Sequence, residues 1–285
     1  MSRTGATLHD DGLHDPHDGM HDHDRGLSHD LPRLLDRRRV LGLLGGLGLA
    51  TSVAACADDT TSEGSAPATD SAVDVSGGEI PEETAGPFPG DGSNGPDVLA
   101  ESGVVRSDIT RSFGASTTVA EGVPLIVRLR VLDVSDGAST GGLAGAAVYL
   151  WHCDREGRYS LYSDGATGEN YLRGVQEADA DGWVTFRSIY PAAYSGRWPH
   201  IHFEVYPSLD DATSASNKLR TTQLALPEDV SREVYATDGY DASTGNLDQT
   251  SLQTDMVFSD GYSLQMARLT GSVDSGLTAT LNVPV

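Results

Sequence analysis

Two histidines separated by one residue, His200 and His202, are the first candidates for chemistry in this sequence. Successive side chains of a strand point to opposite faces, so both imidazoles would share one face if residues 200–206 form a strand. The apolar residues that alternate with them would then enter a core on the other face. Imidazole is the commonest metal-binding side chain. The pair alone leaves open whether it binds a metal or lies on an ordinary strand.

Two tyrosines accompany the histidines. Tyr194 lies just before the expected strand, in a loop whose prolines and Gly196 suit a tight turn. Tyr159 follows another expected strand and a glycine-containing turn, in the stretch 151–160 (WHCDREGRYS). Together, the four side chains offer two phenols and two imidazoles.

Phenolate oxygen is a hard, anionic donor that suits ferric iron. A free tyrosine has a pKa near 10, but a bound cation of high charge deprotonates its ligands near neutral pH. Zinc sites prefer cysteine, histidine and carboxylate, and Fe(II) oxygenases use two histidines and one carboxylate. A set with two tyrosines therefore points to Fe(III).

The order of these residues and their flanking sequence resemble the intradiol ring-cleavage dioxygenases, the family of protocatechuate 3,4-dioxygenase and catechol 1,2-dioxygenase. The resemblance covers roughly residue 79 to the C-terminus and is strongest over residues 122–229. The matching segments are LAGAAVYLWHCDREGRYS (143–160), YLRGVQEADADGWVTFRSIYPAAY (171–194), RWPHIHFEV (197–205) and TTQL (221–224).

This resemblance implies an enzyme that cleaves a catechol-type ring between its two hydroxylated carbons. The substrates would be a small aromatic diol and O2, and the product a cis,cis-muconate-type acid. Tyr159, Tyr194, His200 and His202 would be the Fe(III) ligands, with no organic cofactor. Tyr194 would leave the metal when the catechol binds and accept one of its protons.

The resemblance also assigns two catalytic residues beyond the ligands. Arg197 would stabilise negative charge on the ring as it develops, unless it forms an ordinary surface salt bridge. Gln223 would support the site from the TTQL segment, unless it only satisfies sheet backbone.

Substrate contacts are implied for Gly86, Pro87 and Phe88, although a turn without a catalytic role fits them equally well. Gly196 stands where many relatives carry an aromatic residue, which leaves the substrate open among catechol, protocatechuate, hydroxyquinol and lignin-derived phenols.

Short alternating segments bounded by glycine, proline and aspartate predict an all-β fold, a β-sandwich of mainly antiparallel strands with long loops. No convincing helix is expected, and residues 237–249 suggest a long surface loop. The expected strands are 125–131, 147–152, 183–188, 200–206, 221–226, 255–260, 267–273 and 277–283.

The chain has 285 residues and a net charge of −23, which excludes a nucleic-acid binder because such proteins need a basic surface. Residues 1–36 hold six of the nine histidines in an aspartate-rich leader expected to be disordered. Synthesis from Met20 would omit part of this leader. If the leader persists, metal storage is an alternative function for it.

Residues 37–56 predict a twin-arginine-type export signal, with arginines before a short apolar run. An uncleaved membrane anchor is the alternative. The run ends in VAAC, which resembles a lipobox, so Cys56 is either lipidated, holding the protein on the outer face of the cell membrane, or removed with the signal. Residues 57–100 read as an acidic flexible linker and 101–285 as the dioxygenase domain.

Two expectations remain, one about assembly and one about function. Relatives in the family often form dimers, so a homodimer is expected as one oligomeric form. A non-catalytic extracellular β-sandwich that binds phenolics or polysaccharide is the alternative function, since fold does not fix function. Such a module would have no need for the four-ligand set.

Overall fold

The computed structural model describes residues 78–135 and 141–285. The expected leader (1–36), the export signal with Cys56 (37–56) and most of the acidic linker lie outside the described residues, so they stay predictions. Within the described ranges, no helix is both long enough and apolar enough to cross a membrane.

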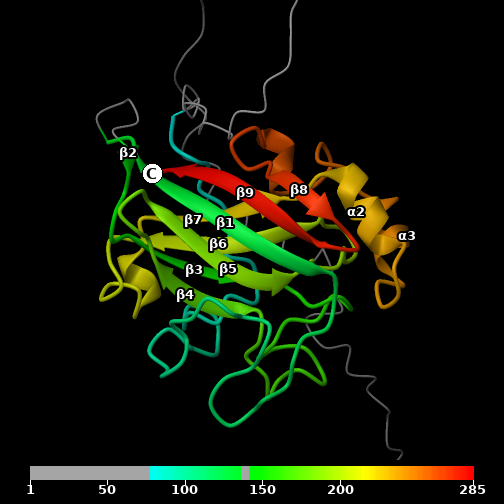
Figure 1. The fold of residues 1–285 in the computed structure, drawn as a ribbon, viewed down its shortest axis with the longest axis horizontal. Coiled ribbons are helices and arrows are strands. Elements are labelled where there is room, and N and C mark those ends of the chain that lie inside the picture. Colours follow the sequence, from blue (N-terminus) through cyan, green and yellow to red (C-terminus); the bar gives the residue numbers. More distant parts are fainter. Residues whose placement is uncertain (1–77, 136–140) are drawn as a thin grey trace, which may run out of the picture.

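The first sheet is built around the long strand β1 (Pro124–Asp133). One edge of β1 pairs in parallel with the C-terminal strand β9 (Gly276–Pro284), which pairs in turn with β8 (Arg268–Ser272). The other edge pairs antiparallel with β5 (Trp183–Ile189) and with the two-residue strand β2 (Gly141–Gly142). Figure 1 shows β9 in red beside β1 in green.

The second sheet carries the histidine pair. Its order is β4 (Arg173–Glu177), β3 (Ala147–Trp151), β6 (His200–Tyr206) and β7 (Arg220–Ala225), and every neighbouring pair is antiparallel. Because β6 is bonded on both edges, its backbone is fixed along its whole length. The side chains of this strand therefore have a well-defined direction.

The main apolar core lies between the two sheets. It contains Val127 and Leu129 from β1 and Ile201, Phe203 and Val205 from β6, all fully buried. Alternate side chains share one side of a strand, so the apolar residues of β1 and β6 all point into the space between the two sheets. The expected β-sandwich is confirmed for the described residues, and so is the division of β6 into an apolar face and a histidine face.

The histidine face of the second sheet is covered by the chain that precedes β1. Val98 and Val104 from this covering chain pack with Trp151 of β3 in a second apolar cluster. The cover leaves His200 and His202 each 3% exposed. The two imidazoles are therefore held in a largely dry environment.

Part of the expected linker, residues 78–100, packs on the sandwich. Ile80 is fully buried, and its amide donates to the carbonyl of Pro284 at 2.8 Å. The amide of Glu83 donates to the carbonyl of Thr221 at 2.7 Å. The acidic composition of this stretch gave no sign of docking, because a few apolar side chains and backbone bonds are sufficient to hold it.

The structure departs from the sequence-based expectation in four local elements. Helices α2 (Glu228–Tyr235) and α3 (Ser243–Leu247) occur where no helix was expected. Residues 255–260, expected as a strand, contain a turn and the short 3₁₀ helix Phe258–Asp260, because the Asp255 carboxylate accepts the amides of the residues that follow it. Strand β4 was not expected, since RGVQE lacks apolar alternation. In Figure 1, α2 and α3 lie together beyond one end of the sheets.

Candidate metal centre

The two histidines of β6 direct their Nε2 atoms toward one point. His200 Nε2 and His202 Nε2 lie 3.1 Å apart, and the two rings are nearly perpendicular at 79°. Two nitrogens this close cannot both carry a hydrogen along the line that joins them. At least one of the two Nε2 atoms therefore presents a lone pair to the space between the rings.

The two tyrosines complete this arrangement from two separate loops. The Tyr194 hydroxyl lies 3.1 Å from His200 Nε2, and the Tyr159 hydroxyl lies 3.5 Å from that of Tyr194. Ligand atoms about 2 Å from one cation lie about 3 Å from one another by simple geometry. The structure thus brings all four sequence-derived ligand candidates together at spacings that suit a common metal ion.

The surrounding groups fix the orientation of each imidazole. His200 Nδ1 lies 2.5 Å from the carbonyl of Trp198, so Nδ1 carries the hydrogen and Nε2 keeps its lone pair for the centre. The ring of His202 stacks on Trp151 at 4.9 Å and 8°. Its Nδ1 is buried and has no hydrogen-bond partner among the described residues. Stacking, rather than a hydrogen bond, therefore orients this second ring.

Burial sets the protonation of the four groups. It lowers the pKa of His200 and His202 well below the usual value, so both imidazoles are neutral and able to act as ligands. Burial raises the pKa of Tyr159 well above its usual value and that of Tyr194 to about 12. The phenols are therefore protonated at neutral pH unless a cation deprotonates them.

The donor set fits a hard cation of high charge. Two phenolate oxygens would supply two negative charges, and the imidazoles would add neutral nitrogen donors. Cys153, the nearest thiol in sequence, instead directs Sγ toward the carbonyl of Ala192 at 3.6 Å. Within residues 78–135 and 141–285, no three or more His, Cys, Asp or Glu side chains gather as a metal cluster. Any metal held here would therefore depend on the two tyrosines.

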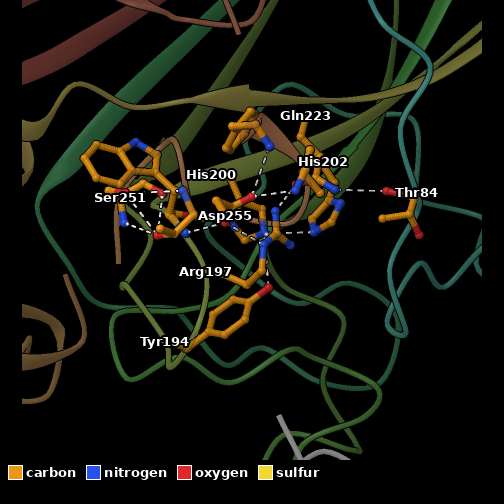
Figure 2. A network of polar contacts seen from close by, with 12 residues as sticks. Thr84, Tyr194, Arg197, His200, His202, Gln223, Ser251 and Asp255 are labelled. Carbon is orange, nitrogen blue, oxygen red and sulfur yellow. Dashed lines mark hydrogen bonds and ion pairs between the residues drawn. The ribbon is translucent and has the colours of Figure 1, made fainter. Parts of the chain in front are cut away.

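Arg197 lies inside the site rather than on the surface. Its residue exposure is 7%, and Nη1 lies 3.5 Å from His200 Nε2. Its Nε donates to Asp255 Oδ2 at 2.9 Å, and its Nη2 donates to Gln223 Oε1 at 2.6 Å. Figure 2 shows Arg197 beside the histidines with Asp255 and Gln223 attached to it. The guanidinium is thus fixed with one edge toward the centre.

Gln223 connects the arginine with the covering chain. While its Oε1 accepts from Arg197, its Nε2 donates to the carbonyl of Thr84 at 2.9 Å. Gln223 therefore does bond to backbone, as the alternative interpretation expected. The backbone belongs to the covering chain, however, and not to the sheet. This bond holds the covering chain at Thr84 beside the site, and Figure 2 shows Thr84 next to the histidines.

The expected substrate contacts lie next to the ligands. A Cβ added to Gly86 would be 3.4 Å from Cε1 of His202. The ring of Phe88 packs against that of Tyr159, with 5.0 Å between their centroids. Between them, Pro87 accepts a bond from the exposed Asn94 through its carbonyl. Gly86 and Phe88 are therefore in a position to meet a molecule bound at the centre.

Other polar residues of the matching segments lie outside the four-donor set. His152 is buried, but its Nε2 bonds to Ser188 Oγ and its Nδ1 to the carbonyl of Cys153, both at 2.7 Å. Asp179 accepts the amides of Asp181 and Trp183 and so forms a turn, which is a common role of aspartate.

Asp255 is a residue of the site that the sequence did not indicate. Its carboxylate is fully buried. It accepts bonds from Arg197 Nε and from three backbone amides, those of Trp198, Val257 and Phe258. It lies 58 positions from Arg197, and no motif marks it. The carboxylate holds the arginine and the start of β6 in one place.

Replacing Asp255 with asparagine is expected to lower the free energy of unfolding by about 3 kcal/mol, because the buried cation of Arg197 loses its counter-charge. Asp108→Asn is the matched control, since Asp108 also pairs with an arginine, Arg187, but the side chains are 42% and 71% exposed. That change should cost less than about 1 kcal/mol. Chemical denaturation measures both, and equal losses would contradict the account of Asp255.

Comparison with known proteins agrees with this geometry. Residues 94–231 match the family described as Dioxygenase. An intradiol ring-cleavage dioxygenase from Tetranychus urticae has a similar structure, with a TM-score of 0.55 and 23% identity, over 72% of this chain and 92% of that one. A second dioxygenase crystal structure gives a TM-score of 0.55 and 23% identity, over 73% and 94% of the two chains. At these identities the likeness concerns the fold.

Among curated proteins, catechol 1,2-dioxygenase 2 from Acinetobacter lwoffii is 36% identical over 74 residues, which are 26% of this chain and 25% of that protein. The match thus spans about a quarter of the curated relative. The resemblance found in the sequence is confirmed over the matched residues: the chain carries the dioxygenase family pattern over 94–231 on the fold of the intradiol ring-cleavage dioxygenases, while export stays a prediction. Both tyrosines and both histidines lie within the matched residues.

Proposed function

We propose that this protein is an Fe(III)-dependent intradiol dioxygenase. It cleaves a catechol-type ring between the two hydroxylated carbons and adds both atoms of O2, which gives a cis,cis-muconate-type product. The observation that carries the proposal is the convergence of two phenol oxygens and two imidazole nitrogens, with neighbouring contacts of 3.1 to 3.5 Å. The sequence match to the dioxygenase family supports it.

Ferric iron is the cation that best suits this donor set. The residues that would hold it are Tyr159, Tyr194, His200 and His202. Two phenolates offset most of its charge, which neutral imidazoles alone would not do. When bound, the iron would make a catechol reactive toward O2.

The protein's own groups account for proton transfer and charge. The phenolate oxygen of Tyr194 accepts a proton from the catechol hydroxyl, since the pKa of this tyrosine is high without a metal. The guanidinium of Arg197 stabilises negative charge on the bound ring, because its Nη1 faces the centre while two other nitrogens are fixed. The covering chain keeps water away.

Location and assembly belong to the proposal as well. The arginines and apolar run of residues 37–56 favour export through a twin-arginine route. The protein would then act as a secreted enzyme, or as one anchored through lipid on Cys56. Intact mass of the exported form distinguishes these states, and its solution mass tests the expected homodimer.

Oxygen uptake with a panel of catechols tests the activity. The panel holds catechol, protocatechuate and hydroxyquinol, and resorcinol serves as a matched diol whose hydroxyls are not adjacent. The expected result is uptake with at least one catechol, a muconate-type product spectrum and no uptake with resorcinol. Binding without turnover would favour the non-catalytic module instead, and a product opened beside the diol would contradict the intradiol assignment.

A further inference from the structure

Arg173, the first residue of β4, is a fully buried cation. No carboxylate pairs with it among the described residues. A guanidinium has five N–H groups, and the side chain makes five hydrogen bonds, all to neutral oxygens. The acceptors are the carbonyls of Phe88, Pro89 and Ser160, with the hydroxyls of Ser160 and Tyr149, at 2.7 to 3.3 Å.

These acceptors join two segments of the site. Phe88 and Pro89 belong to residues 84–90, which we call the strap. Ser160 directly follows the ligand candidate Tyr159. A single side chain therefore fixes the strap relative to the loop that carries one phenol. Since a buried charge needs every hydrogen bond it can make, this geometry is strongly specified.

The strap passes so close to Arg173 that position 90 requires a glycine. Gly90 has φ of +68°, and a Cβ there would lie 2.8 Å from Arg173 Nη1. The amide of Gly90 donates to the hydroxyl of Tyr162 at 2.8 Å. The ring of Tyr162 in turn contacts that of Phe88, with 5.3 Å between centroids. The Arg173 guanidinium carbon lies 5.5 Å from the centroid of the Tyr162 ring, so the two neighbouring side chains hold the strap together.

The strap meets the centre through two residues. Gly86 approaches the ring of His202, and Phe88 packs on the ring of Tyr159. A ring bound at the four donors would therefore have Phe88 as a neighbour. The strap lies entirely outside the residues 94–231 that match the family, so that match assigns it no role.

We propose that Arg173 is a positioning residue that sets the substrate specificity of the site through the strap. By holding the carbonyls of Phe88 and Pro89, it fixes the Phe88 ring beside Tyr159 and so limits the site to small catechols. The inference rests on the proposed function, because it concerns the size of the diol that the centre accepts. A purely structural Arg173 would instead affect stability without a change in substrate preference.

Arg173→Lys keeps the charge and gives up most of the hydrogen bonds. The expected result is a KM for catechol that rises about tenfold, a kcat within about threefold of the wild type and an unchanged metal content. Phe88→Ala should raise KM similarly and should also improve kcat/KM for 4-tert-butylcatechol relative to catechol. The double variant should be no worse than the worse single variant, since both act through one ring.

Arg106→Lys is the matched control. Arg106 also donates to backbone carbonyls, those of Arg111, Asn170 and Arg173, but makes no hydrogen bond to the strap. The Arg106→Lys variant should leave KM and the substrate preference near the wild-type values. Additive effects in the double variant, or the same change in KM from Arg106→Lys, would overturn the proposal.

Hydrogen exchange gives a readout that needs neither metal nor turnover. In Arg173→Lys, amides of the strap should exchange about tenfold faster while those of β6 stay protected. If the strap stays as protected as in the wild type, the inference fails. If Arg173→Lys does not fold, an unchanged substrate preference in Phe88→Ala overturns it. A wild type without turnover refutes the proposed function instead, and that outcome is separate from the exchange result.

Discussion

Replacing His200 with alanine is expected to abolish stoichiometric metal binding and, with it, all ring cleavage. His200 Nε2 lies 3.1 Å from both His202 Nε2 and the Tyr194 hydroxyl, so it occupies the middle of the donor set. Without His200, only three donors remain, and the nitrogen that contacts both of its neighbours is missing. Metal analysis of the purified variant, with oxygen uptake on catechol, measures both effects.

His152→Gln is the control for this experiment. His152 is also a buried histidine and directly follows strand β3 of the second sheet, but its ring bonds to Ser188 and to backbone. It should keep the metal at the wild-type ratio even if the fold is less stable. A His200→Ala protein that retains full metal content would rule out His200 as a ligand.

The phenols allow the same comparison. Tyr159→Phe removes one oxygen donor, and we expect the metal or its colour to be lost. Tyr162→Phe is matched, because that hydroxyl lies in the neighbouring part of the fold and, within the described part of the chain, bonds only to the amide of Gly90 and the carbonyl of Asn94. A Tyr159→Phe protein with the spectrum of the wild type would contradict a role for this phenolate.

Arg197→Ala is expected to keep its metal and to lose about 100- to 1,000-fold in turnover, the usual effect of removing a fixed charge that stabilises a transition state. Nη1 of Arg197 faces His200 Nε2 at 3.5 Å, while its other nitrogens bond to Asp255 and Gln223. The cation is therefore held in place before any substrate arrives. Metal content and steady-state kinetics are measured on the same preparation.

Arg232→Ala controls for the loss of a positive charge elsewhere. Arg232 pairs with Glu228 and Asp248 on the surface, with 45% of its side chain exposed. It should turn over at the wild-type rate. Because Arg197→Ala leaves Asp255 buried without its partner, the assay is run well below the melting temperature of the variant. Normal turnover by Arg197→Ala would show that its assigned role is wrong.

The sequence predicts the central strand well because its information is local. The alternation of residues 200–206 places the histidines on one face and Ile201, Phe203 and Val205 in the core, and the structure agrees. The same period predicts β1, β5 and β9. Local spacing cannot bring Tyr159 to the histidines, and only the resemblance to a known family suggested that contact.

The residues that position the site are harder to find from sequence. Asp255 reaches Arg197 across 58 positions, and Arg173 reaches Phe88 across 85. Asp255 lies in a stretch that was expected to be a strand, although its carboxylate caps a turn there. Arg173 begins a strand without an apolar pattern. Both are buried charged residues, whose partners depend on the packed fold and leave no periodic signal.

The most direct test of the account is the metal content and visible spectrum of the purified wild-type protein. The account predicts stoichiometric iron and a tyrosinate-to-iron charge-transfer band that shifts when catechol is added without O2. Colourless protein with stoichiometric zinc would contradict a ferric centre built from Tyr159, Tyr194, His200 and His202.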